Sequence, residues 1–273
     1  MQNQQPSKIH QVLFVPALLG TVLLLAACSN KNVDTVNIVG SSSVQPFVEL
    51  LAEEYLKKYP EENVEVQGGG STAGLQAVVN RLADIGMSSR LLTQEESMAF
   101  ESTVIALDGL AVVVNPANPV SKVTSSQLRD IFSGTIGNWK DLGGEDRPIR
   151  PISREEGSGS RDNFGALVME ELSISRRALT QESNGAVREL VKGDRSAIGY
   201  ISLSMVSHEL KALLVDGEAP TLENIQQGLY TLTRPFLFVT QGEPAPSTKR
   251  FFEYCLSAEG QEVLEKEGLV RKP

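Results

Sequence analysis

The chain has 273 residues, of which 41% are hydrophobic and 22% charged, with 25 Lys and Arg against 34 Asp and Glu. This is the composition of an ordinary globular protein, and the length fits one large domain or two of medium size. The net charge of −9 argues against nucleic acid and anionic lipid as partners, because both repel an acidic surface.

The N-terminal segment differs from the rest of the chain. Its apolar stretch over 12–27 is too short and too interrupted for a membrane span. The stretch ends in Leu25-Ala26-Ala27-Cys28, which resembles the bacterial lipobox, in which the cysteine is lipidated and becomes the new N-terminus. We therefore predict a lipoprotein signal peptide over 1–27, a palmitate-carrying anchor on Cys28 and a tether over 28–34. The alternative is a plain secretory signal with an incidental cysteine.

Few side chains remain that suit metal or nucleophilic chemistry. Lipidation of Cys28 leaves Cys255 as the only thiol, so no intrachain disulfide can form. Cys255 lies in the apolar run 251–256, which is typical of a buried structural cysteine. His208 lies in a polar run and is expected at the surface. One histidine and one cysteine make no recognisable zinc site, and we expect neither a metal nor a cofactor.

Short β-like runs alternate with amphipathic helices along the chain. In the first half we expect strands over 35–39, 63–67, 83–88 and 110–115 and helices over 46–59 and 73–83. In the second half we expect strands over 149–153, 197–201, 210–215 and 237–240, a helix after residue 160 and a closing helix over 247–264. The runs 83–88 and 110–115 are typical of buried parallel strands. This alternation favours an α/β fold whose parallel sheets are covered by helices on both faces.

Three of these helices carry apolar residues at helical spacing, which we expect to face the core. In the helix over 46–59 they are Phe47, Leu50, Leu51 and Tyr55. In the helix over 73–83 they are Leu75, Val78, Val79 and Leu82. In the helix after residue 160 they are Phe164, Leu167, Val168 and Leu172.

Three glycine/serine turns each follow a predicted strand and precede a predicted helix. They are Gly40–Ser43, Gly68–Thr72 and Gly157–Ser160. A helix N-terminus offers unpaired N–H groups and a partial positive charge, so each turn is a candidate anion site. In α/β sheets ligands lie at the carboxyl ends of the strands, which is where all three turns are placed.

The spacing of the turns predicts two lobes. Two turns lie near the start of the chain and the third lies near its middle, while 114–119 and Arg234-Pro235 are natural crossing points. We predict one lobe from 35–114 plus 236–273 and a second from 115–235. The three turns would then form opposite walls of one cleft.

Three common motifs are not supported by the residues around them. The run 68–73 fits a dinucleotide-binding fingerprint, but no acidic residue follows at the required distance, and no glycine run ends in the Gly-Lys-Ser/Thr of a P-loop. Ser158 lies between two glycines, but the order of residues differs from a nucleophile elbow. His208 is in no position that marks it as a base, so a serine hydrolase is not supported.

The segment 154–161 combines two arginines, two glutamates and the third turn. A guanidinium makes two parallel hydrogen bonds to an oxyanion, and a nearby carboxylate can hold it in position. We therefore predict that Arg154 binds an anion and that Glu156 orients it. A solvated charged loop with a helix cap is the alternative.

Taken together, these motifs are similar to those of the phosphate-binding lipoproteins of Pst-type ABC transporters. The resemblance rests on 40–46, 68–74, 84–90 and 153–161, with further matches at 130–134, 138–139 and 197–200. It covers essentially the whole chain after the N-terminal segment. It implies a two-lobed periplasmic-binding-protein-like (type II) fold, with two doubly wound α/β domains joined by a hinge of two crossings.

The resemblance also implies which residues bind phosphate. The first lobe would contribute Ser42, Ser43, Val44 and Ser71, and the second would contribute Arg154, Ser158, Gly159 and Ser160. Many family members have an aspartate that accepts the proton of hydrogen phosphate, whereas this chain has Ser89 there. A serine hydroxyl still accepts one hydrogen bond, but it rejects a fully deprotonated anion less strongly than a carboxylate. Arg90 either adds a second cation or supports its loop.

We therefore expect a non-enzymatic receptor that binds inorganic phosphate between its lobes and delivers it to ABC permease subunits. It would be a monomer, lipid-anchored on the extracytoplasmic face of the cell membrane. One alternative is a receptor for another tetrahedral oxyanion, such as sulfate, molybdate or tungstate. Others are an extracytoplasmic phosphoester hydrolase and a phosphate sensor or adhesin without transport.

Overall fold

The computed structural model describes residues 34–271, which form one compact unit. The predicted signal peptide, the lipidation site Cys28 and nearly all of the tether lie outside the described residues. No helix in the described part of the chain is long and apolar enough to cross a membrane.

The strands form one large mixed sheet, whose main path runs β2-β1-β3-β11-β4-β8-β6-β7. These strands are β1 (Thr35–Gly40), β2 (Asn63–Gly68), β3 (Ile85–Ser88), β4 (Glu101–Val114), β6 (Arg150–Arg154), β7 (Leu179–Gln181), β8 (Ala197–Ser202) and β11 (Thr233–Thr240). The short strands β9 (Lys211–Ala212) and β12 (Val270–Arg271) pair with β4, and β5 (Lys122–Val123) pairs with β10 (Leu214–Val215). Most strands lie where the sequence predicts them, although the predicted strand over 210–215 is divided in two.

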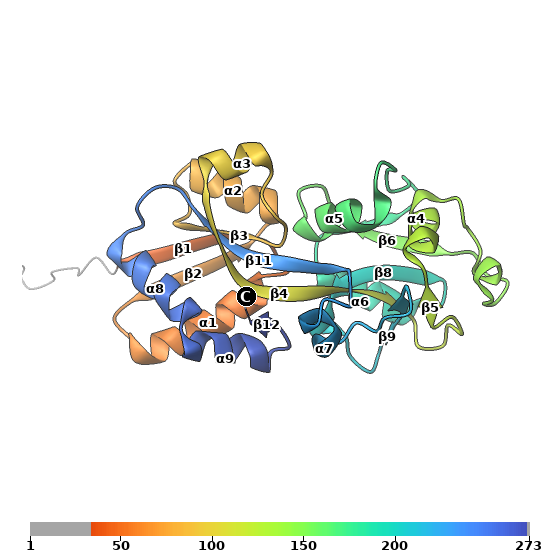
Figure 1. Ribbon diagram of the computed structural model, residues 1–273. Coiled ribbons are helices and arrows are strands. Elements are labelled where there is room, and N and C mark those ends of the chain that lie inside the picture. Colours follow the sequence, from red (N-terminus) through yellow and green to blue (C-terminus); the bar gives the residue numbers. More distant parts are fainter. Residues whose placement is uncertain (1–33, 272–273) are drawn as a thin grey trace, which may run out of the picture. The chain divides into compact units, whose positions relative to one another are not determined.

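The helices cover both faces of this sheet. They are α1 (Gln45–Lys58), α2 (Ser71–Val79), α3 (Gln94–Ala99), α4 (Ser125–Ser133), α5 (Gly159–Phe164), α6 (Asn184–Gly193), α7 (Leu222–Gln226), α8 (Pro246–Leu256) and α9 (Ala258–Lys266). Three short turns of other helix types lie at Trp139–Leu142, Gly165–Met169 and Leu203–Met205. In Figure 1, α1, α8 and α9 lie on one side of strands β1 to β3, and α2 and α3 lie on the other.

The prediction that both apolar runs are parallel strands is wrong for 110–115. β3 does pair with β1 in parallel, but β4 is antiparallel to both of its main neighbours, β11 and β8. A strand buried on both faces has a continuous apolar run whatever its direction, so the pattern indicates burial and not orientation. β4 and β11 form a long antiparallel ribbon in the middle of the sheet (Figure 1).

Two large hydrophobic clusters share this ribbon, which agrees with the predicted two-lobed α/β fold. Ile105 and Phe236 belong to the cluster that contains α1, α8 and β1. Leu110 and Val112 belong to the cluster that contains α4 and β8. The exact lobe boundaries stay a prediction. Val114, which we assign to the first lobe, packs in the second cluster.

The predictions for two helices are wrong in part. α2 ends at Val79 because Arg81 adopts a left-handed backbone (φ +56°), and Leu82 is therefore 73% exposed. After α5 the chain continues as a π-helical turn over 165–169, which changes the face of the helix and leaves Leu172 50% exposed. Two further predicted core residues, Val79 and Leu167, are also exposed.

The predicted closing helix over 247–264 is two helices. The Oγ of Ser257 accepts a hydrogen bond from the backbone N–H of Gly260 and so caps α9. Cys255 is fully buried, as predicted, and this burial raises the pKa of its thiol well above the usual value. His208 is exposed, also as predicted.

Candidate functional site

The three glycine/serine turns lie at the carboxyl ends of strands. They connect β1 to α1, β2 to α2 and β6 to α5. Gly40 has φ +148°, and a Cβ there would lie 2.2 Å from the carbonyl oxygen of Met87, so only glycine fits. The second and third turns touch, because the N–H of Thr72 donates to the carbonyl oxygen of Gly157 at 3.2 Å. The chain thus brings together turns that are about 90 residues apart in sequence.

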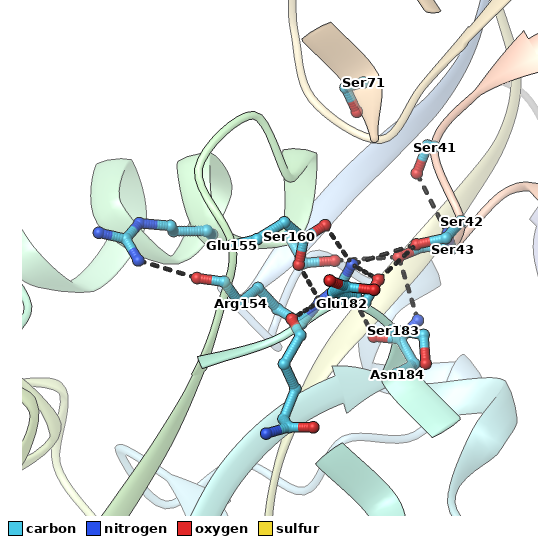
Figure 2. Close-up of polar contacts among 12 residues, drawn as sticks. Ser41, Ser42, Ser43, Ser71, Arg154, Glu155, Ser160, Glu182, Ser183 and Asn184 are labelled. Atoms are coloured by element: carbon cyan, nitrogen blue, oxygen red, sulfur yellow. Dashed lines mark hydrogen bonds and ion pairs between the residues drawn. The ribbon is translucent and has the colours of Figure 1, made fainter. Parts of the chain in front are cut away.

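Three buried side chains connect the first turn to the third, and we call them the polar cluster: Ser43, Ser160 and Asn184. The Oγ atoms of Ser43 and Ser160 are 3.0 Å apart, and the Nδ2 of Asn184 donates to the Oγ of Ser43, also at 3.0 Å. Figure 2 shows these hydrogen bonds. Each of the three residues is at most 3% exposed. Asn184, at the start of α6, is absent from the residues that the sequence predicts.

Arg154 lies at the end of β6 beside the polar cluster and is 1% exposed (Figure 2). Its Nη2 donates to the Oγ of Ser42 at 3.1 Å, and its Nη1 faces the Oδ1 of Asn184 at 3.4 Å. Further hydrogen bonds hold it to the carbonyl oxygens of Gln181 and Glu182. The guanidinium therefore connects the first turn to the segment that precedes α6.

The carboxylate that orients Arg154 is Glu155, so the prediction of Glu156 is wrong. Both carboxylate oxygens of Glu155 accept from Arg154, at 3.0 Å from Nε and 2.9 Å from Nη2. Glu156 is exposed to solvent. Spacing along the sequence cannot show which of the two glutamates pairs with Arg154. The pairing depends on the backbone direction where β6 ends and the third turn begins.

The second turn and Ser89 form another buried group. The backbone N–H of Ser89 donates to the Oγ of Ser71 at 3.1 Å, and the Oγ of Ser89 accepts from that of Ser41 at 2.9 Å. Gly159 lies against both residues, since a Cβ on it would be 2.4 Å from each of the two Oγ atoms of Ser71 and Ser89. This close approach explains the glycine at the start of α5.

The other predicted site residues also lie in these turns. Ser158 is 2% exposed at the N-terminus of α5, and its side chain makes no capping hydrogen bond. Val44 is fully buried, and its N–H donates to the carbonyl oxygen of Ser41 at 3.0 Å. Ser42 is half-buried.

Arg90 supports its loop, which decides between the two roles left open for it. Its guanidinium makes two hydrogen bonds to Glu96, at 2.7 and 2.8 Å, and its Nε is 2.9 Å from the Oδ2 of Asp162 on α5. Burial raises the pKa of Asp162, and the charge of Arg90 opposes this rise. Arg90 thus connects the loop after β3 to Asp162 on α5. It makes no hydrogen bond to the three residues of the polar cluster.

A buried ion pair at the site has no counterpart in the sequence prediction. Arg234 on β11 and Asp108 on β4 are cross-strand partners, and neither side chain is exposed. The Nε and Nη2 of Arg234 are 3.0 and 2.8 Å from one oxygen of Asp108, and its Nη1 donates to the Oγ of Ser160. In the sequence, Arg234 is recognisable only as part of a crossing point between the lobes. The usable signal is a charged residue inside an otherwise apolar stretch, namely Asp108 within 104–114 and Arg234 before the apolar run 235–239.

The described residues include no group of three or more His, Cys, Asp or Glu that could hold a metal ion. A cavity of about 610 Å³ is lined by Arg81 and Glu243 and by no residue of the polar cluster. What the turns bring together is therefore a dense set of hydrogen-bond donors with two guanidiniums. Such a set suits a small oxyanion.

The comparisons with known proteins agree with this chemistry. The model of the PBP superfamily domain matches residues 26–259. The phosphate-binding protein PstS of Borreliella burgdorferi is 30% identical over 275 residues, which are 96% of this chain and 99% of that protein. PstS of Bacillus subtilis is 28% identical over 277 residues, 94% of this chain and 92% of that protein.

Solved structures give the same result. A structure from Clostridium perfringens, assigned as a phosphate ABC transporter substrate-binding protein and solved with bound phosphate, is 39% identical with a TM-score of 0.85. It covers 88% of this chain and 100% of its own. An ABC-type phosphate transport receptor from Vibrio cholerae is 37% identical with a TM-score of 0.75, over 87% of this chain and 100% of its own. The chain belongs to the PBP superfamily and, within it, to the family of the PstS phosphate-binding proteins.

Proposed function

We propose that this protein captures inorganic phosphate outside the cytoplasm and delivers it to an ABC permease. The observation that carries the proposal is the polar cluster, where a serine from the first turn and one from the third meet beside two buried guanidiniums. The phosphate-binding relatives support it, because they match the chain over almost its whole length. The role is that of a binding protein and not of an enzyme.

The binding residues we propose are Ser42, Ser43, Val44, Ser71, Ser89, Arg154, Ser158, Gly159 and Ser160. In the described structure the serine side chains bond to one another, and the anion would replace these bonds with bonds to its four oxygens. Hydrogen bonds to a charged acceptor contribute about 1.5–3 kcal/mol each. After the cost of ordering and closure, several of them account for micromolar affinity, about −8 kcal/mol.

The acidic surface does not prevent anion binding, because the site is buried. Local dipoles and guanidiniums set its field, and the helix N-termini of α1, α2 and α5 follow directly from the three turns. The direct test is a phosphate titration of the chain without residues 1–27, for which we expect a dissociation constant of about 1 µM or lower.

Selectivity between phosphate and sulfate depends on Ser89. Ser89 is fully buried, and its Oγ is an acceptor with no negative charge. Replacing it with aspartate (Ser89→Asp) adds a carboxylate that accepts the phosphate proton and repels sulfate. We expect the ratio of phosphate to sulfate affinity to rise at least about tenfold, as one charge-assisted hydrogen bond implies.

Paired titrations of both anions measure this ratio. Ser89→Asn is the matched control, because it adds similar volume without the charge. An equal ratio in the Ser89→Asp variant and the control would show that Ser89 does not face the anion.

The membrane anchor is part of the same proposal. Cys28 follows the lipobox-like Leu25-Ala26-Ala27, and a lipid there would hold the receptor beside its permease. Replacing Cys28 with serine is expected to move the protein from the membrane fraction to the soluble fraction of cells. A Cys255→Ser variant, which alters the buried cysteine instead, should stay with the membrane. Equal membrane association of both variants would contradict the anchor.

A further inference from the structure

The Arg234–Asp108 pair has no evident structural purpose. Arg234 and Asp108 are fully buried on adjacent strands of the β4–β11 ribbon. Burial lowers the pKa of Arg234 and raises that of Asp108, while their mutual attraction opposes both shifts. Removing two charges from water costs free energy that the attraction between them recovers only in part, so such a pair contributes little to stability. Its presence points to a use for the charge.

The pair is arranged so that one edge of the guanidinium faces the site. Two nitrogens of Arg234 bond to Oδ2 of Asp108, whose Oδ1 accepts from the Oγ of Ser202 at 2.8 Å. Asp108 is thus held at the edge of the guanidinium that does not contact the polar cluster. The third nitrogen, Nη1, donates to Ser160, which itself bonds to Ser43. The positive end of the pair is therefore directed at the proposed anion.

From this geometry we infer that Arg234 is a second cation of the phosphate site, that it binds through Nη1, and that it favours the doubly charged form of the anion. This inference rests on the proposed function. Asp108 is a positioning residue, which fixes the guanidinium without touching the anion. With Arg154, the site then has two guanidiniums for two negative charges. This charge favours any dianion, so the choice between phosphate and sulfate stays with the hydrogen-bond acceptor at position 89.

The ribbon makes this contact rigid. Asp108 and Arg234 are held by backbone pairing between β4 and β11, and this ribbon contributes to both large hydrophobic clusters. Ser160, by contrast, lies on α5. A cation on the ribbon therefore keeps its place if the two clusters move relative to each other, which favours a preorganised site.

The test is the pH dependence of phosphate binding. Phosphate exchanges its second proton near neutral pH, so a site for the dianion loses affinity as the pH falls, by about tenfold per pH unit below that point. The charged or titratable groups that face Arg234 are Asp108 on β4, Arg154 on β6 and Tyr200 on β8. The melting temperature without phosphate, followed over the same pH range, reports any titration of these groups.

The informative variant is the neutral pair Arg234→Gln with Asp108→Asn. It avoids the unpaired buried carboxylate that Arg234→Gln alone would leave. We expect the double variant to bind phosphate about tenfold to a hundredfold more weakly at pH above neutrality, as the loss of one charged hydrogen bond implies. We also expect its affinity to change by about threefold or less per pH unit.

Two controls make the result decisive. Arg234→Lys keeps the charge, so it should keep the steep pH dependence even where its affinity falls. Arg150→Gln removes an exposed arginine that pairs with Asp194, and it should match the unaltered protein in affinity and pH dependence. A double variant with unaltered affinity and pH dependence would overturn the inference, while the proposed function would stand. An unaltered protein that binds no phosphate would overturn both.

Discussion

Replacing Gly159 with alanine is expected to reduce phosphate affinity more than about a hundredfold while leaving the protein folded. A Cβ at this position would lie 2.4 Å from the Oγ atoms of both Ser71 and Ser89, closer than van der Waals contact allows. These serines belong to the proposed first lobe, and Gly159 belongs to the second. The added methyl group would therefore keep the lobes apart, and each hydrophobic cluster would still pack.

The measurements are a phosphate titration and thermal unfolding without phosphate. We expect the melting temperature to change by less than about 3 °C. Gly165→Ala is the matched control, because a Cβ there meets nothing within 4 Å and the residue follows α5 directly. Full affinity in the Gly159→Ala variant would contradict a site formed by closure of the three turns.

Replacing Arg154 with lysine is expected to weaken phosphate binding by more than about tenfold, because an ammonium cannot make two parallel hydrogen bonds to an oxyanion. Stability without phosphate should fall as well, by about 1–3 kcal/mol. The guanidinium of Arg154 donates to the carbonyl oxygens of Gln181 and Glu182, and a lysine ammonium at one point cannot replace both hydrogen bonds. From the sequence alone, no such loss of stability is expected.

Arg188 provides a matched control for this substitution. It pairs with Glu189, the next residue in the chain, as Arg154 pairs with Glu155, but at the surface. Arg188→Lys should therefore leave both affinity and stability unchanged. If Arg154→Lys lowers stability but not affinity, Arg154 holds the segment before α6 and does not bind the anion.

The parts of the site that follow local chemistry could be predicted from the sequence. Each glycine/serine turn is visible as a turn between a strand and a helix, and parallel strands end at the same edge. Ser43, Arg154 and Ser160 could be named on this basis together with the family resemblance. All three are buried, Ser43 contacts Ser160, and Arg154 bonds to Ser42, while their role in binding stays a prediction.

Contacts that depend on strand pairing could not be predicted. Arg234 and Asp108 are 126 positions apart and meet only because β11 and β4 are antiparallel, whereas the apolar pattern favours parallel strands. Asn184 reaches Ser43 from the start of α6, at a separation of 141 residues. Similarly, the exposure of Leu82 follows from one left-handed residue, Arg81, which the helical spacing does not reveal.

The central claim is that the site binds phosphate in preference to sulfate although it has Ser89 where a carboxylate would discriminate. Calorimetric titration of the chain without residues 1–27 with phosphate, and separately with sulfate, tests this claim most directly. We predict a dissociation constant of about 1 µM or lower for phosphate and clearly weaker binding of sulfate. Tight binding of sulfate with none of phosphate would contradict the account.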